Sequence, residues 1–269
     1  MTLDLFAVRS ILFLPASNPR AIARAREAGA DLVVLDLEDA VKPEDKVRAR
    51  AAAVEAVASE WPMPVTIRVN GIASEWYDED VAAVRDSNTN LVVLPRADSA
   101  DAILATSQGV QRDVLAMIET AAGVLAAPEI AQEAAALIAG TNDLSADLRL
   151  PPDAGRGPLQ TSLQSIVLAG RAAGIAVFDG VFNGLDDPEG FLTQAEEGCW
   201  LGFDGKSLIH PDQIEPCHRA FAASEAEIDR ARRLLAAATG GAERFDDRMI
   251  ERMHVEAARR LLARATATG

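Results

Sequence analysis

The chain has 269 residues, of which 49% are hydrophobic, and its 41 acidic and 26 basic side chains give a formal net charge of −15. A length near 250 suits one large domain, because it allows a single extensive hydrophobic core. The acidic balance argues against a general affinity for nucleic acid or for anionic membranes, since both require a basic surface. An anionic substrate would therefore need a local arginine or a bound cation.

The cysteine content and the opening segment indicate a compartment. Cys199 and Cys217 do not form the closely spaced pairs typical of metal sites, and two isolated thiols indicate a reducing environment. Residues 1–10 lack the basic and apolar regions of a secretory leader, and no run of 18 apolar residues could span a membrane. We therefore expect a cytoplasmic protein without a membrane partner.

Short runs rich in Val, Ile and Leu recur along the chain, and each is followed by a longer stretch with helical spacing. The runs are continuous rather than alternating, as expected of parallel strands that are buried on both faces. Eight strands are predicted, over residues 9–15, 32–37, 65–70, 91–95, 113–119, 136–141, 175–180 and 199–205. Eight β units with intervening helices predict an α/β fold, the (β/α)₈ TIM barrel.

Helical spacing continues beyond the eighth predicted strand, from about residue 211 to the end. The turn-rich stretch 238–247 interrupts it before a last amphipathic segment. We therefore predict a barrel domain over residues 1–222 and a C-terminal helical extension over 223–269. The extension is interpreted as a docked helix or as a lid.

Charged residues gather where the predicted strands end, and in a parallel barrel these ends converge on one mouth that carries the chemistry. The acids at these positions include Asp36, Glu38, Asp39, Glu119, Asp143 and Asp179, and the bases are Arg68, Arg96 and Lys206. Packed carboxylates raise one another's pKa, so a bound cation accounts best for the cluster. Hard oxygen ligands with few histidines indicate Mg²⁺, or alternatively Mn²⁺, rather than Zn²⁺.

Structural interpretations compete with this one. Asp39 or Asp143 could cap a helix, Arg68 could belong to an internal ion pair, and Asp36 is as readily structural as catalytic. His210, which precedes a proline, is interpreted as a turn or cap residue rather than a catalyst. The sequence contains neither a glycine-rich dinucleotide loop nor a GxSxG nucleophile elbow.

Seven motifs follow one another between about residues 9 and 220: RSILFLP, LDLEDAV, IRVNG, VVLPRADS, IETAAGV, AGTNDLSADL and GFDGKSLIHPDQI. In this order they resemble the HpcH/HpaI aldolase and citrate lyase β-subunit family, in particular its stand-alone acyl-CoA lyases. The resemblance implies a TIM barrel that assembles into homotrimers or hexamers and binds Mg²⁺. It also implies that the protein makes or breaks a C–C bond between an acyl-CoA thioester and a 2-oxo acid.

The same resemblance implies a role for each matching residue. Glu119 and Asp143 match the metal ligands of the family, and Glu38 and Asp39 match acids that hold metal-bound waters. Arg68 matches an arginine that contacts the substrate oxygens. These positions coincide with those selected by the strand-end argument.

Three further assignments depend on details of the motifs. Backbone N–H groups around Gly140 and Thr141 are predicted to hold a substrate carboxylate. Arg96 replaces the usual lysine of the family and keeps its charge for substrate binding, although with a planar fork. Glu251 replaces an aspartate that reaches a neighbouring subunit's site. The extra methylene would shift the carboxylate by about 1 Å, which can cost ~10²-fold in rate.

The predicted function is that of a Mg²⁺-dependent lyase that cleaves or forms a thioester such as malyl-, citramalyl- or citryl-CoA. One alternative keeps the site but uses Glu251 to activate water, as a malyl-CoA thioesterase or a synthase-type enzyme would. Another is an acyl-carrier-dependent subunit of a citrate-lyase-like complex.

Overall fold

The computed structural model describes residues 3–239 and 241–267. The chain divides into two compact units, Met1–Ala220 and Phe221–Gly269, which are described separately below. No helix of the described residues combines the length and apolar character needed to cross a membrane.

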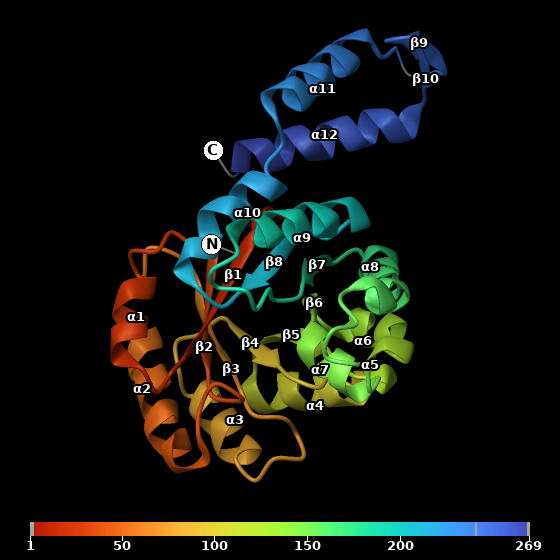
Figure 1. Ribbon diagram of the computed structural model, residues 1–269. Helices are drawn as coiled ribbons and strands as arrows, with labels where there is room; N and C mark the ends of the chain where they lie inside the picture. Colours follow the sequence, from red (N-terminus) through yellow and green to blue (C-terminus); the bar gives the residue numbers. More distant parts are fainter. Residues whose placement is uncertain (1–2, 240, 268–269) are drawn as a thin grey trace. The chain divides into compact units, whose positions relative to one another are not determined.

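Eight parallel strands form the centre of the first unit and close in chain order into a barrel, with β1 pairing β8 (Figure 1). The strands are β1 Ser10–Pro15, β2 Leu32–Asp36, β3 Val65–Arg68, β4 Leu91–Leu94, β5 Asp113–Ile118, β6 Ala136–Ala139, β7 Ala176–Asp179 and β8 Gly205–Leu208. The predicted (β/α)₈ barrel is therefore confirmed.

Helices surround the barrel and connect its strands (Figure 1). They are α1 Pro19–Ala25, α2 Lys46–Ala58, α3 Tyr77–Arg85, α4 Ala100–Val110, α5 Ala121–Leu125, α6 Ala127–Glu133, α7 Thr141–Asp147, α8 Gln160–Ala173, α9 Pro188–Leu201 and α10 Ile214–Phe221. Short 3₁₀ segments lie at Leu5–Ala7, Pro43–Asp45, Gly157–Leu159 and Pro211–Gln213. Local chemistry determines where these helices begin. The Asn18 side chain, for example, accepts a hydrogen bond from the Ala21 N–H, and Pro19 occupies the first helical position.

The eighth strand begins later than predicted. Residues 199–201 complete α9, whose buried face repeats at Phe191, Ala195 and Gly198. Gly202 then ends the helix with a φ of 98°, a left-handed conformation that favours glycine. The strand is Gly205–Leu208, so Lys206 lies near its start rather than after its end. The prediction of a strand at 199–205 was wrong, because the apolar residues that end α9 have the same sequence pattern as a buried strand.

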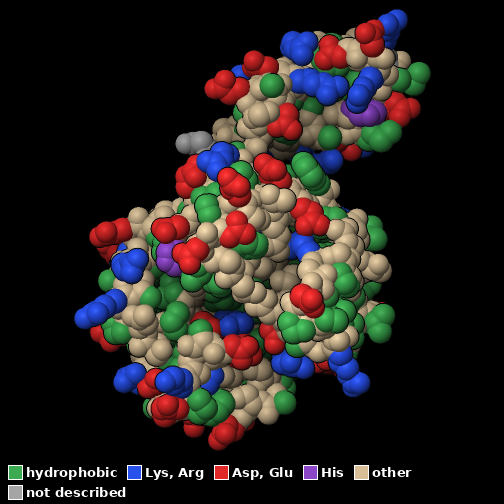
Figure 2. Space-filling view, in the orientation of Figure 1, with side chains coloured by type: hydrophobic (Ala, Val, Ile, Leu, Met, Phe, Trp, Pro, Cys, Tyr) green, Lys and Arg blue, Asp and Glu red, His purple; other side chains and the backbone are tan. Residues whose placement is uncertain are grey.

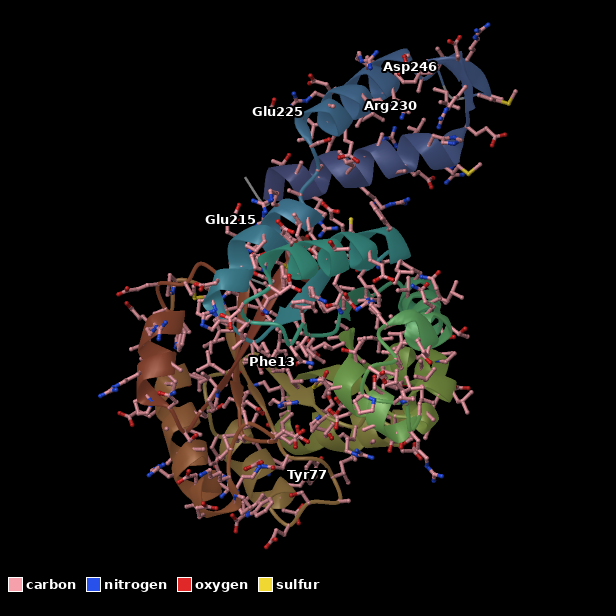
Figure 3. All side chains as sticks on the ribbon, in the orientation of Figure 1. Phe13, Tyr77, Glu215, Glu225, Arg230 and Asp246 are labelled. Carbon is pink, nitrogen blue, oxygen red and sulfur yellow. The ribbon has the colours of Figure 1, made fainter. Side chains whose placement is uncertain are left out.

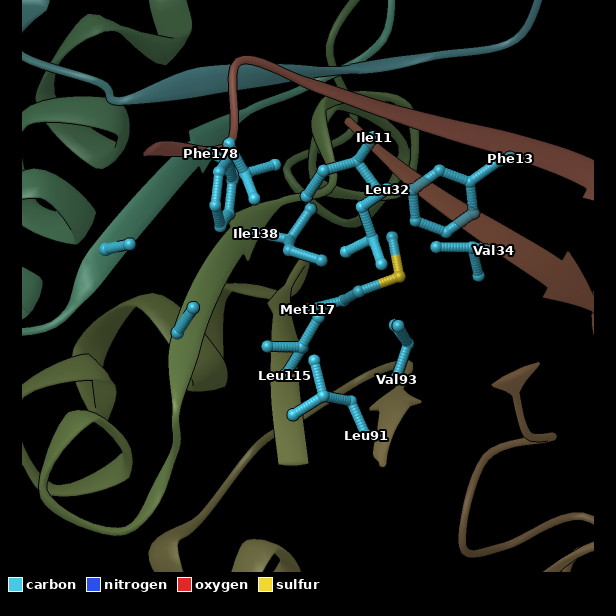
Figure 4. Close-up of a cluster of buried hydrophobic side chains, with 13 residues drawn as sticks. Ile11, Phe13, Leu32, Val34, Leu91, Val93, Leu115, Met117, Ile138 and Phe178 are labelled. Atoms are coloured by element: carbon cyan, nitrogen blue, oxygen red, sulfur yellow. The ribbon is translucent and has the colours of Figure 1, made fainter. Parts of the chain in front are cut away.

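The barrel interior is filled by alternate residues of the strands, as the two-residue repeat of a β-strand requires. Figure 4 shows Phe13, Met117 and Phe178 among the side chains of this buried cluster. The inward positions continue toward the carboxyl ends of the strands, where they are occupied by polar residues. Asp36 lies two residues after the inward Val34, and Glu119 lies two residues after the inward Met117, so both acids point to the same side as those residues. The strand register therefore places these acids at the mouth of the barrel.

The second unit contains α11 Glu225–Ala237, a hairpin of β9 Glu243–Phe245 and β10 Arg248–Ile250, and α12 Arg252–Ala267. It has a small core of its own, built from Ala231, Leu234, Ile250 and Ala258. Ser224 and Glu227 form a reciprocal capping box at the start of α11. The Arg230 Nε lies 3.7 Å from the Asp246 Oδ2, and both side chains are labelled in Figure 3.

Candidate active site and metal centre

A cavity of about 300 Å³ lies at the mouth of the barrel. Its polar lining consists of Asp39, Arg68, Glu119, Thr141, Asn142, Asp143 and Ser207, with the Gly140 backbone between Glu119 and Thr141. Figure 2 shows acidic and basic side chains close together on the face of the barrel unit. The structure therefore brings most of the predicted site residues into one cavity.

Glu119 follows β5 and is 2% exposed. Its Oε1 accepts a hydrogen bond of 2.7 Å from the Arg96 N–H. Its Oε2 is buried and has no hydrogen-bond partner among the described residues. Burial raises the pKa of Glu119 to about 8, although the Arg96 N–H and the Arg68 charge oppose the shift. This oxygen is therefore an acceptor that the protein alone leaves unsatisfied.

Arg68 is fixed by a fork of two hydrogen bonds. Its Nε donates to the Asp36 Oδ1 and its Nη2 to the Asp36 Oδ2, both over 2.6 Å. The guanidinium lies 5.4 Å from the Phe13 ring centroid. Burial alone would lower the pKa of Arg68, but the charges of Asp36 and Glu38 raise it further above its ordinary value. Arg68 is thus a rigid, permanent cation with its Nη1 left outside the fork.

Glu38 faces this remaining nitrogen, with its Oε2 3.0 Å from the Arg68 Nη1. The contact is an ion pair without an aligned hydrogen bond, since the same oxygen has no hydrogen-bond donor among the described residues. Burial raises the pKa of Glu38 to about 7, against the opposing charge of Arg68. The exposed Asp39 is a further cause of the rise. Glu38 is consequently suited to exchange a proton near neutral pH.

Asp143 lies in the first turn of α7, and burial together with the charge of Asp39 raises its pKa. The alternative that Asp39 or Asp143 caps a helix is not observed, because neither α2 nor α7 has a side-chain cap. Both carboxylates line the cavity instead.

Gly140 contributes space rather than a donor. Its N–H donates to the Ile118 carbonyl over 3.0 Å, so the predicted anion-binding role does not fall to this group. A Cβ at this position would lie 2.3 Å from the Glu119 Oε2 and 2.4 Å from the Glu119 Cβ. Glycine is therefore required for the Glu119 carboxylate to occupy its place. Thr141, the other predicted partner of a carboxylate, opens α7 and lines the cavity.

The donor set fits a hard divalent cation. Glu119 and Asp143 line the cavity, and an unsatisfied buried oxygen and raised carboxyl pKa values are the features that a cation would relieve. Within residues 3–239 and 241–267, no group of three or more His, Cys, Asp or Glu side chains could by itself hold a metal ion. Two direct carboxylates with water in the other positions is the usual arrangement for Mg²⁺.

Arg96 has a positive φ of 47°, and its exposed side chain lines a second cavity of about 480 Å³. This cavity adjoins the first through Asp39, which lines both. The main chain of Arg96 thus supports Glu119, while its side chain faces the neighbouring space.

Two charged residues predicted at the mouth lie elsewhere. Asp179 follows Phe178, which fills the barrel interior, so Asp179 points outward between strands and helices. It accepts hydrogen bonds from the Lys206 Nζ over 2.9 Å and the Arg156 Nη2 over 2.7 Å. Lys206 is completely buried in this ion pair. Both residues therefore stabilise the barrel wall and do not reach the cavity.

The remaining predictions concern Glu251 and His210. Glu251 is an exposed residue of the second unit, and its N–H donates to the His254 Nδ1 over 3.0 Å. The His210 Nδ1 accepts from the Asp212 N–H, as expected of a cap.

Sequence reasoning missed two groups of residues. Asn142 and Ser207 line the cavity, and the Ser207 Oγ is buried without a hydrogen-bond partner in the described part of the chain. Both stand inside quoted motifs, which was the available signal. No such signal marked Lys46, which lines the second cavity, or Asp80, which is buried and bonded to Asn70 of that lining.

Comparisons with known proteins agree with this geometry. A family model described as HpcH/HpaI aldolase/citrate lyase matches residues 9–211. A (3S)-malyl-CoA thioesterase of Cereibacter sphaeroides is 38% identical over 272 residues, which cover 96% of this chain and 95% of the relative. The citrate lyase subunit beta of Escherichia coli is 32% identical, with 97% and 94% covered.

Among solved structures, the chain is similar to the protein CitE of Mycobacterium tuberculosis in complex with magnesium, acetoacetate and coenzyme A. The TM-score is 0.86 at 32% identity, and the match covers 97% of this chain and 99% of that chain. Fold, motifs and relatives agree, and the resemblance seen in the sequence is confirmed. The chain belongs to the HpcH/HpaI aldolase/citrate lyase family.

Proposed function

We propose that the chain is a Mg²⁺-dependent carbon–carbon lyase. It cleaves or forms a 3-hydroxyacyl-CoA thioester, such as malyl-, citramalyl- or citryl-CoA, with an acyl-CoA and a 2-oxo acid as the other reactants. The observation that carries the proposal is the unsatisfied, buried Glu119 Oε2 in a cavity that also holds Arg68 and Asp143. The related CitE structure with magnesium, acetoacetate and coenzyme A supports it.

Glu119 and Asp143 would hold the Mg²⁺ ion directly, with Mn²⁺ as an alternative. Glu38 and Asp39 would hold its water ligands. When bound, the ion supplies positive charge that polarises the oxygens of the 2-oxo acid. Its presence would also favour the ionised form of Glu119, whose pKa burial otherwise raises to about 8.

Arg68 stabilises the charge that develops during C–C cleavage. In that reaction the 3-hydroxyl group loses its proton, the C2–C3 bond breaks, and negative charge gathers on the thioester oxygen of the departing enolate. Asp36 holds two nitrogens of Arg68, so the guanidinium is oriented before substrate arrives. Pre-organised charge of this kind commonly contributes ~10²-fold or more to a rate.

Glu38 is the group of this chain that best suits the proton transfer. Burial raises its pKa, so it can accept the proton of the 3-hydroxyl group and return it to C2 of the enolate, which yields the acyl-CoA. Thr141 and Asn142 line the cavity of Arg68 and Glu119 and offer hydroxyl and amide donors for the carboxylate of the oxo acid. The N–H of Gly140 is not among these donors, because it is bonded within the sheet.

Thioester hydrolysis is a second candidate, because the curated relatives include proteins named (3S)-malyl-CoA thioesterase. In that case Glu251 would activate a water molecule. A third candidate is a subunit that acts on an acyl-carrier protein, as the relative named citrate lyase subunit beta suggests. The lyase would release a 2-oxo acid and an acyl-CoA, and the thioesterase would release free CoA. The complex subunit would turn over only acyl groups that are bound to a carrier protein.

The experiment supplies malyl-, citramalyl- and citryl-CoA to the purified protein with Mg²⁺. A coupled dehydrogenase reports the 2-oxo acid, and a thiol reagent reports free CoA. We expect oxo acid without free CoA. Free CoA alone would favour the hydrolase, and no turnover except of carrier-bound substrates would favour the complex subunit.

Glu119→Gln and Asp143→Asn test the metal assignment. Each should weaken Mn²⁺ binding and lower turnover by ~10²-fold or more, because a carboxylate ligand is lost. The exposed Asp212→Asn is the matched control and should change neither. Full activity and unchanged Mn²⁺ binding in Glu119→Gln would contradict the assignment.

The proposed assembly is a homotrimer or hexamer in which the unit 221–269 packs on a neighbouring subunit. The separate core of this unit around Ile250, beside Glu251, supports it. Light scattering measures the assembly. For any turnover that is lost in both Arg68→Met and Glu251→Gln subunits alone, mixing the two variants tests whether the site is shared. Recovered activity in the mixture would support a shared site, and none would contradict it. The cytoplasmic location stays a prediction.

A further inference from the structure

Lys46 is a buried lysine that the proposed chemistry does not use. It opens α2 and is 5% exposed. All three protons of its ammonium have an acceptor: the Leu37 carbonyl at 2.7 Å, the Glu38 carbonyl at 2.8 Å and the Asn70 Oδ1 at 2.7 Å. Lysines are rarely buried, and burying one is costly unless each proton is bonded. Two of its three partners are main-chain atoms of the segment that carries Glu38.

That segment is fixed from its other side by Asp36. The Asp36 Oδ1 accepts from the Glu38 N–H over 2.8 Å, and the Oδ2 accepts from the Ala40 N–H over 3.1 Å. The Leu37 N–H donates to the Arg68 carbonyl over 3.0 Å. The main chain of residues 36–40 is therefore clamped between an aspartate on the inside of the barrel and a lysine on the outside.

Further residues hold the lysine end of this clamp. The Asn70 Nδ2 donates to the Leu37 carbonyl over 3.0 Å and to the Asp80 Oδ2 over 2.6 Å. The Arg50 Nε donates to the Asp80 Oδ1 over 2.6 Å. Asp80 belongs to α3, which opens at Tyr77, labelled in Figure 3. The network thus connects two helices and the end of β3 to one loop.

We propose that Lys46 is a positioning residue that fixes the main chain at Glu38 and so directs the Glu38 and Asp39 carboxylates toward Arg68 and the cavity. Without the ammonium, the Glu38 carbonyl keeps only the Val41 N–H at 2.9 Å and the Leu37 carbonyl keeps only the Asn70 Nδ2 at 3.0 Å, so this main chain loses its connection to α2 and can shift. The Glu38 and Asp39 side chains are attached to this segment, so their carboxylates change direction when it shifts. Lys46 does not line the cavity of Arg68; it lines the second cavity, which adjoins the first at Asp39. The inference rests on the proposed function in that Glu38 and Asp39 serve the bound cation.

The test compares two buried lysines. Lys46→Met removes the ammonium from the clamp, and Lys206→Met removes one from the barrel wall, where it pairs with Asp179 away from the cavity. Both variants should unfold at lower urea concentrations. Only Lys46→Met should weaken Mn²⁺ binding, measured by electron paramagnetic resonance at conditions where both are folded. The expected rise in Kd is about tenfold, the usual effect of losing a group that orients metal-site carboxylates.

Kinetics with a thioester that the wild type cleaves give a second readout. Lys46→Met should lower kcat about 10- to 100-fold while KM stays within about threefold, because protein acceptors take all three protons of the ammonium and leave none for the thioester. Lys206→Met should keep both constants within about twofold. If Lys46→Met does not fold, Lys46→Gln, which keeps two N–H donors, replaces it with an expected rise in Kd of about threefold or more.

The outcomes separate this inference from the proposed function. Unchanged Mn²⁺ affinity in the folded Lys46 variant, or an equal loss in Lys206→Met, would overturn the positioning role, and so would a wild type that binds no Mn²⁺. If the wild type binds Mn²⁺ but cleaves no thioester, the proposed reaction fails, while the difference between the two lysine variants still decides the role of Lys46.

Discussion

Asp36 and Arg68 face each other across neighbouring strands, where the parallel register of β2 and β3 pairs them directly. Two hydrogen bonds of 2.6 Å join the carboxylate to the guanidinium as a planar fork. Asp36, for which the sequence supported a structural and a catalytic role equally, thus orients the cation of the site. The same carboxylate also accepts the Glu38 N–H, so one side chain fixes both an arginine and a loop.

Asp36→Asn should therefore affect activity as well as stability. An amide cannot accept both N–H groups of the fork, so Arg68 would turn away from its direction in the cavity. We expect kcat/KM to fall by ~10²-fold, since small misplacements of this kind have such effects. The free energy of unfolding should fall by about 3 kcal/mol, because a buried charge loses its partner. Steady-state kinetics and urea unfolding measure the two changes.

The exposed pair of Arg85 and Asp86 provides the control, because Asp86→Asn breaks an ion pair of 3.7 Å at the surface. Its expected effect on unfolding is below about 1 kcal/mol, with no effect on turnover. An Asp36→Asn enzyme as active as the wild type would show that Arg68 needs no fork.

Gly140→Ala is the second prediction. The added methyl group would meet the Glu119 Oε2 at 2.3 Å and the Glu119 Cβ at 2.4 Å, so the glutamate must move. We expect Mn²⁺ affinity to fall about tenfold or more, because Glu119 is a proposed ligand. The crowding should also lower the free energy of unfolding by about 1–3 kcal/mol. Calorimetric titration with Mn²⁺ and urea unfolding measure these effects.

Gly71→Ala is the matched control, since a Cβ there meets nothing within 4 Å and its backbone is not left-handed. This variant should bind Mn²⁺ like the wild type. Equal affinities in Gly140→Ala and the wild type would mean that the Glu119 carboxylate does not take part in binding.

The strands and most of the cavity were predictable because burial on both faces leaves long apolar runs, and because strand ends meet at one mouth. It was harder to predict whether the side chain at each strand end points into the barrel or away from it. Side chains two residues apart on a strand point to the same side, so Glu119 points inward like Met117. Asp179 comes one residue after the inward Phe178 and therefore points outward. Applied to each strand end, the two-residue repeat would have excluded Asp179 from the site. The position of Lys206 on β8 could not be predicted, because the apolar residues at the end of α9 have the same sequence pattern as a buried strand.

Lys46 could not have been assigned from the sequence. It stands at the start of a helix, where a lysine is ordinarily solvated. Its acceptors are carbonyl oxygens of Leu37 and Glu38, and main-chain acceptors leave no trace in residue types. Only the folded loop shows that this ammonium is buried while residues such as Arg48, on the same helix, stay exposed.

Asp31 yields a prediction about pH. Its Oδ2 accepts hydrogen bonds from the Arg9 N–H at 2.7 Å and Nε at 3.1 Å, and the His218 Nε2 lies 3.4 Å away. Burial by itself raises the pKa of Asp31, but the hydrogen bonds from His218 and Arg9 outweigh it and hold the pKa well below the ordinary 3.8. The folded state therefore prefers the ionised carboxylate, and the stabilisation it provides is fully present above the unfolded-state pKa.

Asp31→Asn should lower the free energy of unfolding by about 2 kcal/mol at pH 7, because Arg9 and His218 lose a charged partner. As the pH falls below about 4, protons bind the unfolded chain first, so the wild type loses its advantage and the two curves converge. The exposed Asp113→Asn should follow the wild type within about 0.5 kcal/mol at every pH. Urea unfolding between pH 3 and 8 measures the difference. A gap that widens in acid would require a raised pKa for Asp31, which is incompatible with donors converging on its carboxylate.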